Sequence, residues 1–506
     1  MSENVRHIPL GEWWDPSRVF ETLYGTASHA FWLDAGADAR TGRSYLGAAG
    51  ARSRYATASV ANNTVSVITP AAPERPPSVT TGSIFDFLRA ELPAPSPTAA
   101  DAGFDGEFRL GWVGWLGYAL GAQTGGGTVP ASPSPPASPS AWSPSSSPDA
   151  ALLEIDRAVM FDHATRTVTL IARTYPDDSP GTVDRWAEHV VSALRAAPAR
   201  ATRPNPVPRL PLAQARWRHS PERYARLIEE CLVAIRAGDA YQVCLTNEIT
   251  VDGRVDPVEA YRRLRHSSPS HHGGLLRFGD VSLLSASPEQ FLHVTPAGAL
   301  RTKPIKGTRP RSLDAARDRD LATELRSSEK ECAENLMIVD LMRNDLGRVA
   351  ALGSVAVTAL LAVESYPHVH QLVSTIEARL AADRTAIDAV EACFPAGSMT
   401  GAPKRSAMTI IDALENGPRG VYAGAFGYFG LDGTIDLAIV IRSIVLSPNA
   451  AVIGTGGGIT ALSNAAEEIE ETRVKAAALL AALGVRDASS AAPTDAPEST
   501  RDASDE

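Results

Sequence analysis

The sequence predicts a protein of mixed helix and strand structure, and two observations point to it. Residues 1–120 alternate short apolar runs with turns, for example at 43–47 and 110–115, which is typical of β-strands. From residue 220 to about 483, segments with helical spacing of apolar residues alternate with strand-like runs. With 506 residues the chain can bury a large core and form two to four domains.

The first region, residues 1–210, is predicted to be rich in β-strands. Further strands are expected at 158–161 and 167–172, and a helix at 185–196. Residues 125–148 consist mainly of Ser, Pro, Gly and Ala. Such a segment cannot bury enough apolar surface to order itself, so it is predicted to be a flexible insertion. Residues 197–211 hold five prolines and predict a linker.

The second region, residues 211–486, begins with a helix. Ser220 precedes a proline and is a predicted N-cap, and Gly238 is a predicted C-terminal stop. A strand is expected next, at 241–251. The last residues, 487–506, are rich in Ala, Ser, Asp and Glu and are predicted to be disordered.

Composition excludes several classes of function. Charged residues make up 21% and hydrophobic residues 44%, and the net charge is −10, so no basic nucleic-acid footprint is present. Residues 1–16 have no apolar core and are not expected to act as a signal peptide, and the most apolar stretch, residues 110–122, is too short to span a membrane. We therefore expect a cytoplasmic protein without nucleic-acid or membrane partners. Four cysteines form no C-x-x-C pair and predict free thiols in a reducing compartment: Cys231, Cys244, Cys332 and Cys393.

Two pairs of glutamates are spaced for metal binding. Glu331 and Glu334 are three residues apart on a predicted helix, and Glu468 and Glu471 repeat the spacing near the C-terminus, with Ser463 as a predicted N-cap. Four carboxylates on two helices suit one hard divalent cation such as Mg²⁺, some of them acting through water. The alternative is two solvated acidic helix faces, with Glu471 paired to a lysine four residues later.

Lys306 and Glu289 are the candidate catalytic residues. Lys306 follows a predicted strand at 298–302 and would be a nucleophile only as the neutral amine, which requires its pKa to fall from about 10.4. Glu289 lies between apolar strands, where burial would raise its pKa and suit it to general acid catalysis. The alternatives are a solvated lysine and a turn carboxylate that caps backbone amides.

A glycine-rich segment, residues 454–458, lets the backbone approach an anion closely. As an isolated signal it also fits an ordinary turn. Its meaning comes from the other motifs that accompany it in order along the chain.

Over roughly residues 215–483 these motifs together resemble the chorismate-utilising enzymes, which include anthranilate synthase, aminodeoxychorismate synthase and isochorismate synthase. The resemblance rests on an ordered series of segments: 238–243, 287–289, 304–311, 333–345, 372–375, 400–404, 427–428, 441–442, 456–458 and 468–472. It implies an α+β fold like that of anthranilate synthase component I, with two large antiparallel sheets packed face to face and helices outside. Residues 211–486 would then be the chorismate-binding catalytic region.

The resemblance also implies a role for each site residue. Glu331, Glu334, Glu468 and Glu471 would bind Mg²⁺, which would hold the ring carboxylate of chorismate. Lys306 would attack C2 of the ring, Glu289 would protonate the departing C4 hydroxyl, and ammonia would resolve the adduct at C4. The remaining substrate-binding residues would be Gln242, Thr308, Tyr428, Arg442, Gly456, Gly457, Gly458 and Lys475, with Tyr428 and Arg442 on the enolpyruvyl carboxylate.

Two positions favour one branch of this family. Isochorismate and salicylate synthases have a lysine base where Gln242 stands, and anthranilate synthases usually have alanine where Lys306 stands. Both residues resemble those of component I of aminodeoxychorismate synthase, which uses ammonia from a separate glutamine amidotransferase subunit. The alternatives are component I of anthranilate synthase and a catalytically inactive binding paralogue. Three positions depart from common family residues: Gln290, Gln371 and Leu462.

Some properties stay open at this point. The sequence does not distinguish a folate pathway from a secondary-metabolite pathway, and it does not define the oligomeric state. It also does not say whether Ser44 and its neighbours form a working tryptophan-type pocket.

Overall fold

The computed structural model describes residues 5–92, 104, 106–125, 147–197 and 215–485. The predicted insertion at 125–148, the linker at 197–211 and the tail at 487–506 fall outside these residues except at their edges. The described residues form two sheets of twelve strands each. Among the described residues, every pair of neighbouring strands in both sheets is antiparallel.

The first sheet, called sheet A below, runs in the order β1-β10-β9-β3-β2-β13-β14-β23-β24-β12-β11, and β20 pairs with β12. Its strands are β1 (Val5–Leu10), β2 (His29–Asp34), β3 (Arg43–Ala48), β9 (Arg157–Asp162), β10 (Thr167–Arg173), β11 (Ala215–Trp217), β12 (Gln242–Asp252), β13 (His272–Phe278), β14 (Val281–Ser287), β20 (Gly401–Ala402), β23 (Ser443–Leu446) and β24 (Ala450–Thr460).

The second sheet, sheet B, runs in the order β17-β19-β16-β15-β22-β21-β7-β8-β4-β5-β6, and β18 pairs with β19. Its strands are β4 (Tyr55–Ser59), β5 (Thr64–Ile68), β6 (Ser78–Thr81), β7 (Gly111–Leu116), β8 (Ala150–Ile155), β15 (Gln290–Val294), β16 (Ala299–Thr302), β17 (Ile305–Pro310), β18 (Ala356–Ser365), β19 (Val369–Arg379), β21 (Ala425–Gly430) and β22 (Ile435–Ile439).

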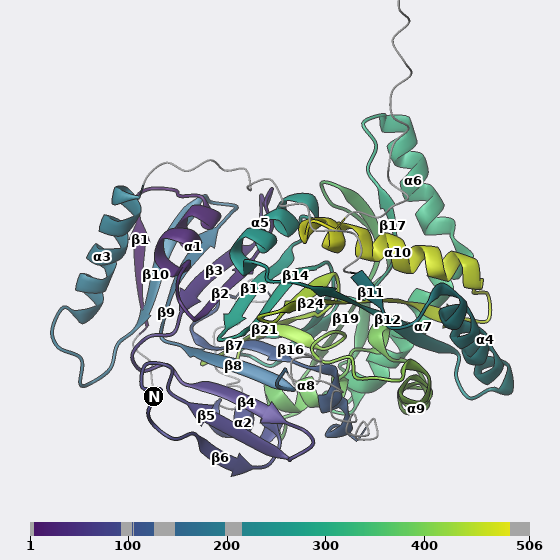
Figure 1. Ribbon diagram of the computed structural model, residues 1–506, viewed down its shortest axis with the longest axis horizontal. Coiled ribbons are helices and arrows are strands. Elements are labelled where there is room, and N and C mark those ends of the chain that lie inside the picture. The colour runs from purple at the N-terminus through teal and green to yellow at the C-terminus, as the bar shows by residue number, and fades with distance from the viewer. Residues whose placement is uncertain (1–4, 93–103, 105, 126–146, 198–214, 486–506) are drawn as a thin grey trace, which may run out of the picture.

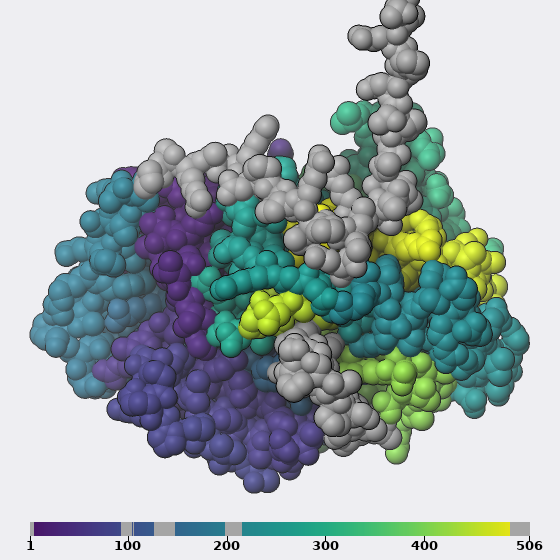
Figure 2. Space-filling model, in the orientation of Figure 1, coloured from purple at the N-terminus to yellow at the C-terminus, as the bar shows by residue number. Residues whose placement is uncertain are grey.

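Both sheets contain strands from both predicted regions of the chain. In sheet A, β2 of the first region pairs with β13 of the second, and in sheet B, β7 pairs with β21. The residue-210 boundary therefore does not separate two sheets. In the space-filling view the N-terminal residues (purple to blue) and the later residues (teal to yellow) form one continuous surface (Figure 2).

Apolar side chains from both sheets meet between them. This layer includes Phe31 and Phe278 of sheet A and Val113 and Trp115 of sheet B, and the rings of Trp115 and Phe278 stack at 5.2 Å. Three further apolar clusters lie under the outer helices, one against sheet B and two against sheet A. The predicted α+β fold with two antiparallel sheets face to face is confirmed.

The helices lie on the outer faces of the sheets, and α10 and α4 pack beside each other over β24 and β12 (Figure 1). They are α1 (Pro16–Tyr24), α2 (Ile84–Glu91), α3 (Thr182–Ala196), α4 (Pro221–Ala237), α5 (Pro257–Ser267), α6 (Ala315–Ser327), α7 (Glu329–Gly347), α8 (Ala386–Cys393), α9 (Lys404–Glu415) and α10 (Ala465–Ala482). Among the described residues, no helix has both the length and the apolar character needed to cross a bilayer.

The local signals around α4 are confirmed. The Ser220 side chain accepts a hydrogen bond from the backbone N–H of Arg223, and Gly238 ends the helix with φ of 85°, which a residue with a Cβ rarely adopts. The prediction for α10 was wrong by one residue. Asn464, not Ser463, is the N-cap, because its side chain accepts from the backbone N–H groups of Ala466 and Glu467.

Candidate active site

A cavity of about 860 Å³ lies between β12 and β24 of sheet A, β17 of sheet B, and the helices α7 and α10. Most of the predicted site residues line it, although they come from widely separated parts of the sequence. The residues brought together are Glu289, Lys306, Thr308, Glu331, Glu334, Arg442, Gly456, Gly457, Gly458, Glu468, Glu471 and Lys475.

The glycines of β24 form one wall of this cavity. A Cβ atom at Gly457 would lie 2.7 Å from Glu468 Oε2, and one at Gly458 would lie 2.2 Å from Gln242 Nε2. Any larger residue would therefore push these polar side chains away. The strand acts as a cradle that admits functional groups close to its backbone.

Gln242 lies at the edge of this cradle and is fully buried. Neither its amide nitrogen nor its amide oxygen has a hydrogen-bond partner among the described residues. Gln242 is not itself among the lining residues, but a buried carboxamide without partners is costly, and its amide lies next to Gly458, which lines the cavity. The substrate-binding assignment of Gln242 stays a prediction, and its geometry supports it.

Three of the four predicted metal ligands are hydrogen-bonded to basic side chains. Arg309 donates to both oxygens of Glu331, at 2.8 and 3.2 Å. The other two contacts join Lys330 Nζ to Glu468 Oε1 at 3.0 Å and Lys475 Nζ to Glu471 at 2.6 Å. Within the described ranges, no three acidic, histidine or cysteine side chains gather closely enough to hold an ion as they stand.

The environment of Lys306 differs from the prediction. Burial favours the neutral amine, but the negative charges of Glu334, Glu289 and Glu471 outweigh it and raise the pKa of Lys306 above its ordinary value. The depressed pKa that a nucleophilic lysine requires is therefore not met by the protein residues alone. The surrounding carboxylates must first be neutralised or protonated before this amine can act as a nucleophile.

The pKa of Glu289 is raised, as expected for a buried carboxyl, while its role as a general acid stays a prediction. Its side chain is 5% exposed, and burial raises the pKa of this carboxyl despite the nearby charges of Lys306 and Lys475. The Ser398 hydroxyl and the backbone N–H of Ile305 also lower the pKa. Ser398 Oγ is buried and has no hydrogen-bond partner of standard geometry among the described residues. Glu289 therefore has the environment of a carboxylic acid that keeps its proton at higher pH than usual.

Tyr428 does not lie in this cavity, and Tyr422 does. The ring of Tyr422 packs on Gly454, where a Cβ would lie 2.1 Å from the ring, and Arg442 lines the same cavity. Tyr428 instead packs against Phe108, with ring centroids 4.7 Å apart. Strand alternation gives the reason: Phe426 and Tyr428 share one face of β21, which turns toward the layer between the sheets. The sequence shows that these two residues share a face, but only the structure shows that this face is turned away from the first cavity.

A buried ion pair supports the wall of the cavity from behind. Arg419 and Glu415 are both 2% exposed and are joined at 2.6 and 2.8 Å. Arg419 also donates to the backbone oxygens of Met399 and Cys244, at 2.6 and 2.7 Å. Since Met399 and Cys244 line the cavity, this guanidinium ties together two segments of the wall.

Replacing Arg419 by methionine should lower the free energy of unfolding by about 3–5 kcal/mol, because Glu415 becomes an unpaired buried charge. Denaturant unfolding measures this change. The control is Arg236→Met, which removes an arginine from an exposed pair with Glu229 and should cost no more than about 1 kcal/mol. Equal effects of the two substitutions would contradict the assignment.

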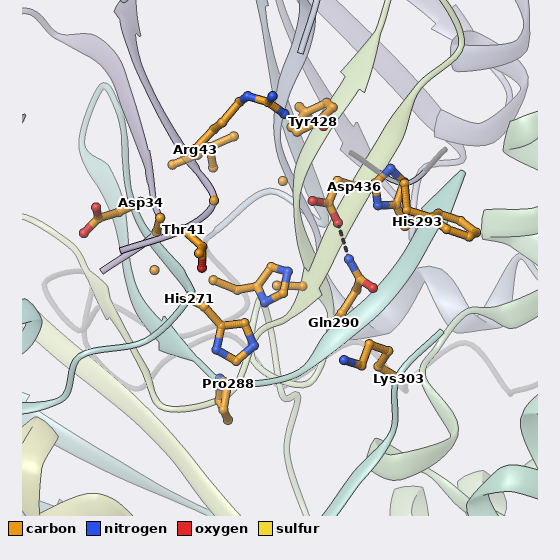
Figure 3. Close-up of a pocket in the computed structure, with 18 of the residues that line it drawn as sticks. Asp34, Thr41, Arg43, His271, Pro288, Gln290, His293, Lys303, Tyr428 and Asp436 are labelled. Carbon is orange, nitrogen blue, oxygen red and sulfur yellow. Dashed lines mark hydrogen bonds between the residues drawn. The ribbon is translucent and has the colours of Figure 1, made fainter. Parts of the chain in front are cut away.

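A second cavity, of about 640 Å³, lies between the sheets beside β2, β3 and β13. Figure 3 shows Tyr428, His271, His293 and Asp436 around it, with Gln290 Nε2 donating to Asp436 Oδ1 at 2.9 Å. Gln290, one of the three departures from common family residues, therefore has a charged hydrogen-bond partner in this structure. The Leu462 departure is a surface position, 70% exposed and outside the lining of the first cavity.

Ser44 does not line the second cavity. Its hydroxyl is fully buried, 2.8 Å from His163 Nε2, and it donates to Asp34 Oδ1 at 3.2 Å. Asp34 in turn forms an ion pair with Arg265. Ser44 therefore belongs to a structural polar network in sheet A, while Asp34 contributes to the wall of the cavity.

Gln371 and His370 point to opposite faces of β19. Gln371 lines the first cavity, at 4% exposure. The His370 ring is hydrogen-bonded to Ser365 through Nδ1 at 2.8 Å and contacts Asp318 through Nε2 at 3.0 Å. His370 does not line the cavity, so it does not replace the histidine that many family members have at position 371.

The cysteines are free, as predicted. Cys231, Cys244 and Cys393 are buried and Cys332 is partly exposed. They lie within helices α4, α7 and α8 and strand β12. None of the four lies at a strand-to-helix turn, where a nucleophilic cysteine would be exposed.

Comparison with known proteins identifies the fold and the family of the chain. A family model described as chorismate binding enzyme matches residues 31–481. The crystal structure of anthranilate synthase component I from Streptococcus pneumoniae TIGR4 is similar with a TM-score of 0.69 and 29% identity, covering 93% of this chain and 98% of that one.

Two curated relatives carry the names of two different activities of the family. An aminodeoxychorismate synthase of Streptomyces griseus is 43% identical over 479 residues, which is 93% of this chain and 63% of the relative. An anthranilate synthase component 1 of Streptomyces coelicolor is 40% identical over 396 residues, covering 74% of this chain and 73% of the relative. The chain thus spans less than two thirds of the first relative's length.

Proposed function

The chain belongs to the chorismate binding enzyme family, and we propose that within this family it converts chorismate and ammonia to 4-amino-4-deoxychorismate, as component I of an aminodeoxychorismate synthase. The observation that carries this proposal is the placement of Lys306 beside the buried carboxyl of Glu289 in one cavity. The similarity to the Streptomyces griseus enzyme supports the same choice.

Binding of a dianionic substrate requires positive charge and hydrogen-bond donors at two ends of the cavity. Arg442 and Tyr422 would bind the enolpyruvyl carboxylate, since a planar guanidinium matches a carboxylate bidentately. Backbone amides of residues 456–458 would approach the ring carboxylate, and Thr308 and Lys475 would add donors along the ring. The unpartnered amide of Gln242 would complete this end.

Magnesium fits the chemistry of the acidic side chains. Glu334 and Glu468 are 9% and 2% exposed and flank the glycine cradle, which is a suitable place for a hard cation between protein and substrate oxygens. Glu471 is close by, and Glu331 would contribute through water because Arg309 holds it. The bound ion would supply charge neutralisation and orientation of the ring carboxylate.

The chemical steps use Lys306 and Glu289. The Lys306 amine forms a bond to C2 while the ring double bonds shift and the C4–O bond breaks, and Glu289 donates the proton with which the hydroxyl leaves as water. Ammonia then bonds to C4, the double bonds shift back, and the C2–N bond to Lys306 breaks. One hard displacement is thereby divided into two easier ones.

Anthranilate synthase is the first alternative, and two observations count against it. Lys306 stands where those enzymes usually have alanine, and Gln371 faces the cavity while His370 is held elsewhere by Ser365 and Asp318. A carboxamide is a poor proton carrier, so elimination of pyruvate lacks a base at this position. The second alternative, an inactive binding paralogue, predicts no turnover at all.

Ammonia would come from a separate glutamine amidotransferase subunit. Such a subunit needs an exposed cysteine nucleophile. In this chain three of the four cysteines are buried, and the fourth, Cys332, is partly exposed within α7. We include in the proposal a cytoplasmic location and the absence of nucleic-acid and membrane partners.

With chorismate, Mg²⁺ and ammonium, the purified chain should form aminodeoxychorismate and neither anthranilate nor pyruvate. Mass spectrometry of the products checks this. With glutamine in place of ammonium, product should form only after the amidotransferase subunit is added. Anthranilate with equimolar pyruvate would establish the first alternative, and no product under any condition would establish the second.

A further inference from the structure

We propose that Lys330 is a built-in competitor of the divalent cation: its ammonium group occupies the Glu468 carboxylate and must leave it when the ion binds. The inference rests on the proposed function, because it concerns the metal ligands assigned there. It adds a residue that controls how strongly the ion is held.

The contact between Lys330 and Glu468 joins the two helices that carry the predicted ligands. Lys330 lies in the first turn of α7, one residue before Glu331 and four before Glu334, so it shares a helix face with Glu334. Its Nζ donates to Glu468 Oε1 on α10 at 3.0 Å. The ammonium therefore sits at the junction where an ion bridging α7 and α10 would bind.

Glu468 needs a positive partner in this position. It is 2% exposed, and a buried carboxylate without a counter-charge is costly. Its Oε1 also accepts from Ser463 Oγ at 2.7 Å, and its Oε2 faces the Gly457 cradle. One oxygen of the carboxylate thus contacts the lysine, while the other is directed into the cavity.

Lys330 can leave more easily than the other basic partners. Lys475 is also fixed by a hydrogen bond to the backbone oxygen of Gly456 at 2.8 Å, and Arg309 by a second carboxylate, Glu324, at 2.9 Å. Among the described residues, Glu468 is the one hydrogen-bond partner of the Lys330 side chain, which is 33% exposed. Its long aliphatic stem lets the ammonium turn outward into water.

Two cations cannot share this carboxylate without strong repulsion. An ion coordinated by Glu468 would lie within a few ångströms of the ammonium, where like charges repel strongly in a partly buried site. Binding of Mg²⁺ must therefore break the Lys330 contact.

The test is the dissociation constant of Mg²⁺, measured by titration calorimetry on the metal-free full chain at constant ionic strength. Lys330→Met should bind Mg²⁺ about tenfold more tightly than the wild type, which corresponds to about 1.4 kcal/mol. Lys330→Gln is a second variant without the charge. The matched control is Lys303→Met, which removes a lysine of similar exposure, 27%, that pairs with Glu364 and lines the other cavity.

Labelling with an amine-reactive reagent gives a second readout that does not depend on activity. Mg²⁺ should increase the labelling of Lys330 in the wild type, because the ammonium moves into solvent, and should leave Lys303 unchanged. Unchanged or weaker Mg²⁺ binding in both Lys330 variants, or Lys330 labelling that ignores Mg²⁺, overturns the inference and leaves the proposed function intact. If no variant binds Mg²⁺ at all, both the inference and the metal site of the proposed function fail.

Discussion

Replacing Lys306 by alanine should reduce the rate of chorismate amination by roughly three orders of magnitude or more, because the substitution removes the proposed nucleophile. In the wild type with chorismate and Mg²⁺ but no ammonia, the peptide that contains Lys306 should gain the mass of chorismate less one water. Steady-state rates and peptide mass spectrometry measure the two effects. The adduct should be absent from the variant.

The matched control for Lys306 is Lys303→Ala. Lys303 is three residues earlier, pairs with Glu364 and does not line the active-site cavity. This variant should keep its activity within a few-fold, and both variants should keep the wild-type circular dichroism spectrum. Wild-type activity in Lys306→Ala would show that the lysine is not part of the chemistry.

Replacing Glu289 by glutamine should lower the amination rate by roughly 10²–10⁴-fold, the usual contribution of a general acid. The pH profile gives the more specific result. Burial raises the pKa of Glu289, so the wild-type carboxyl keeps its proton above the ordinary range, and the rate should fall as pH rises through that raised pKa. The glutamine variant cannot lose a proton there and should lack this limb of the profile.

The concentration of free ammonia must be held constant across these measurements, since ammonium itself loses a proton at alkaline pH. Glu248→Gln is the matched control. Burial also raises the pKa of Glu248, which is 9% exposed and paired with Arg218 but lies outside the lining of the cavity. This variant should keep the wild-type profile. The same alkaline limb in Glu289→Gln would assign the titration to another group.

Several features could be predicted from local sequence because their physical causes are local. Ser220 and Gly238 bound α4 through an N-cap hydrogen bond and a positive φ, and neither depends on distant residues. The spacing of Glu331 and Glu334 places them on one helix face wherever that helix lies. The ordered motifs of residues 215–483 predicted the family, which the match over residues 31–481 confirms.

Other features depend on strand pairing between remote segments. The pairing of β12 with β24 brings Gln242 against Gly458, and only this register shows that the Gln242 amide is buried without a partner. Tyr422 precedes β21 and lines the first cavity, whereas Tyr428 lies on β21 and lines the second, so these two tyrosines, six residues apart, lie in different cavities.

The sequence by itself determined the types of chemical group that line the cavity: a lysine, a carboxylic acid, two pairs of glutamates and a glycine-rich strand. Only the tertiary structure decided their charge states and partners. Lys306 has a raised pKa because three carboxylates lie near it, from the turn between β14 and β15, from α7 and from α10. Lys330 contacts Glu468 because α7 and α10 meet. Electrostatic energies depend on distance and burial in space, which spacing along the chain does not specify.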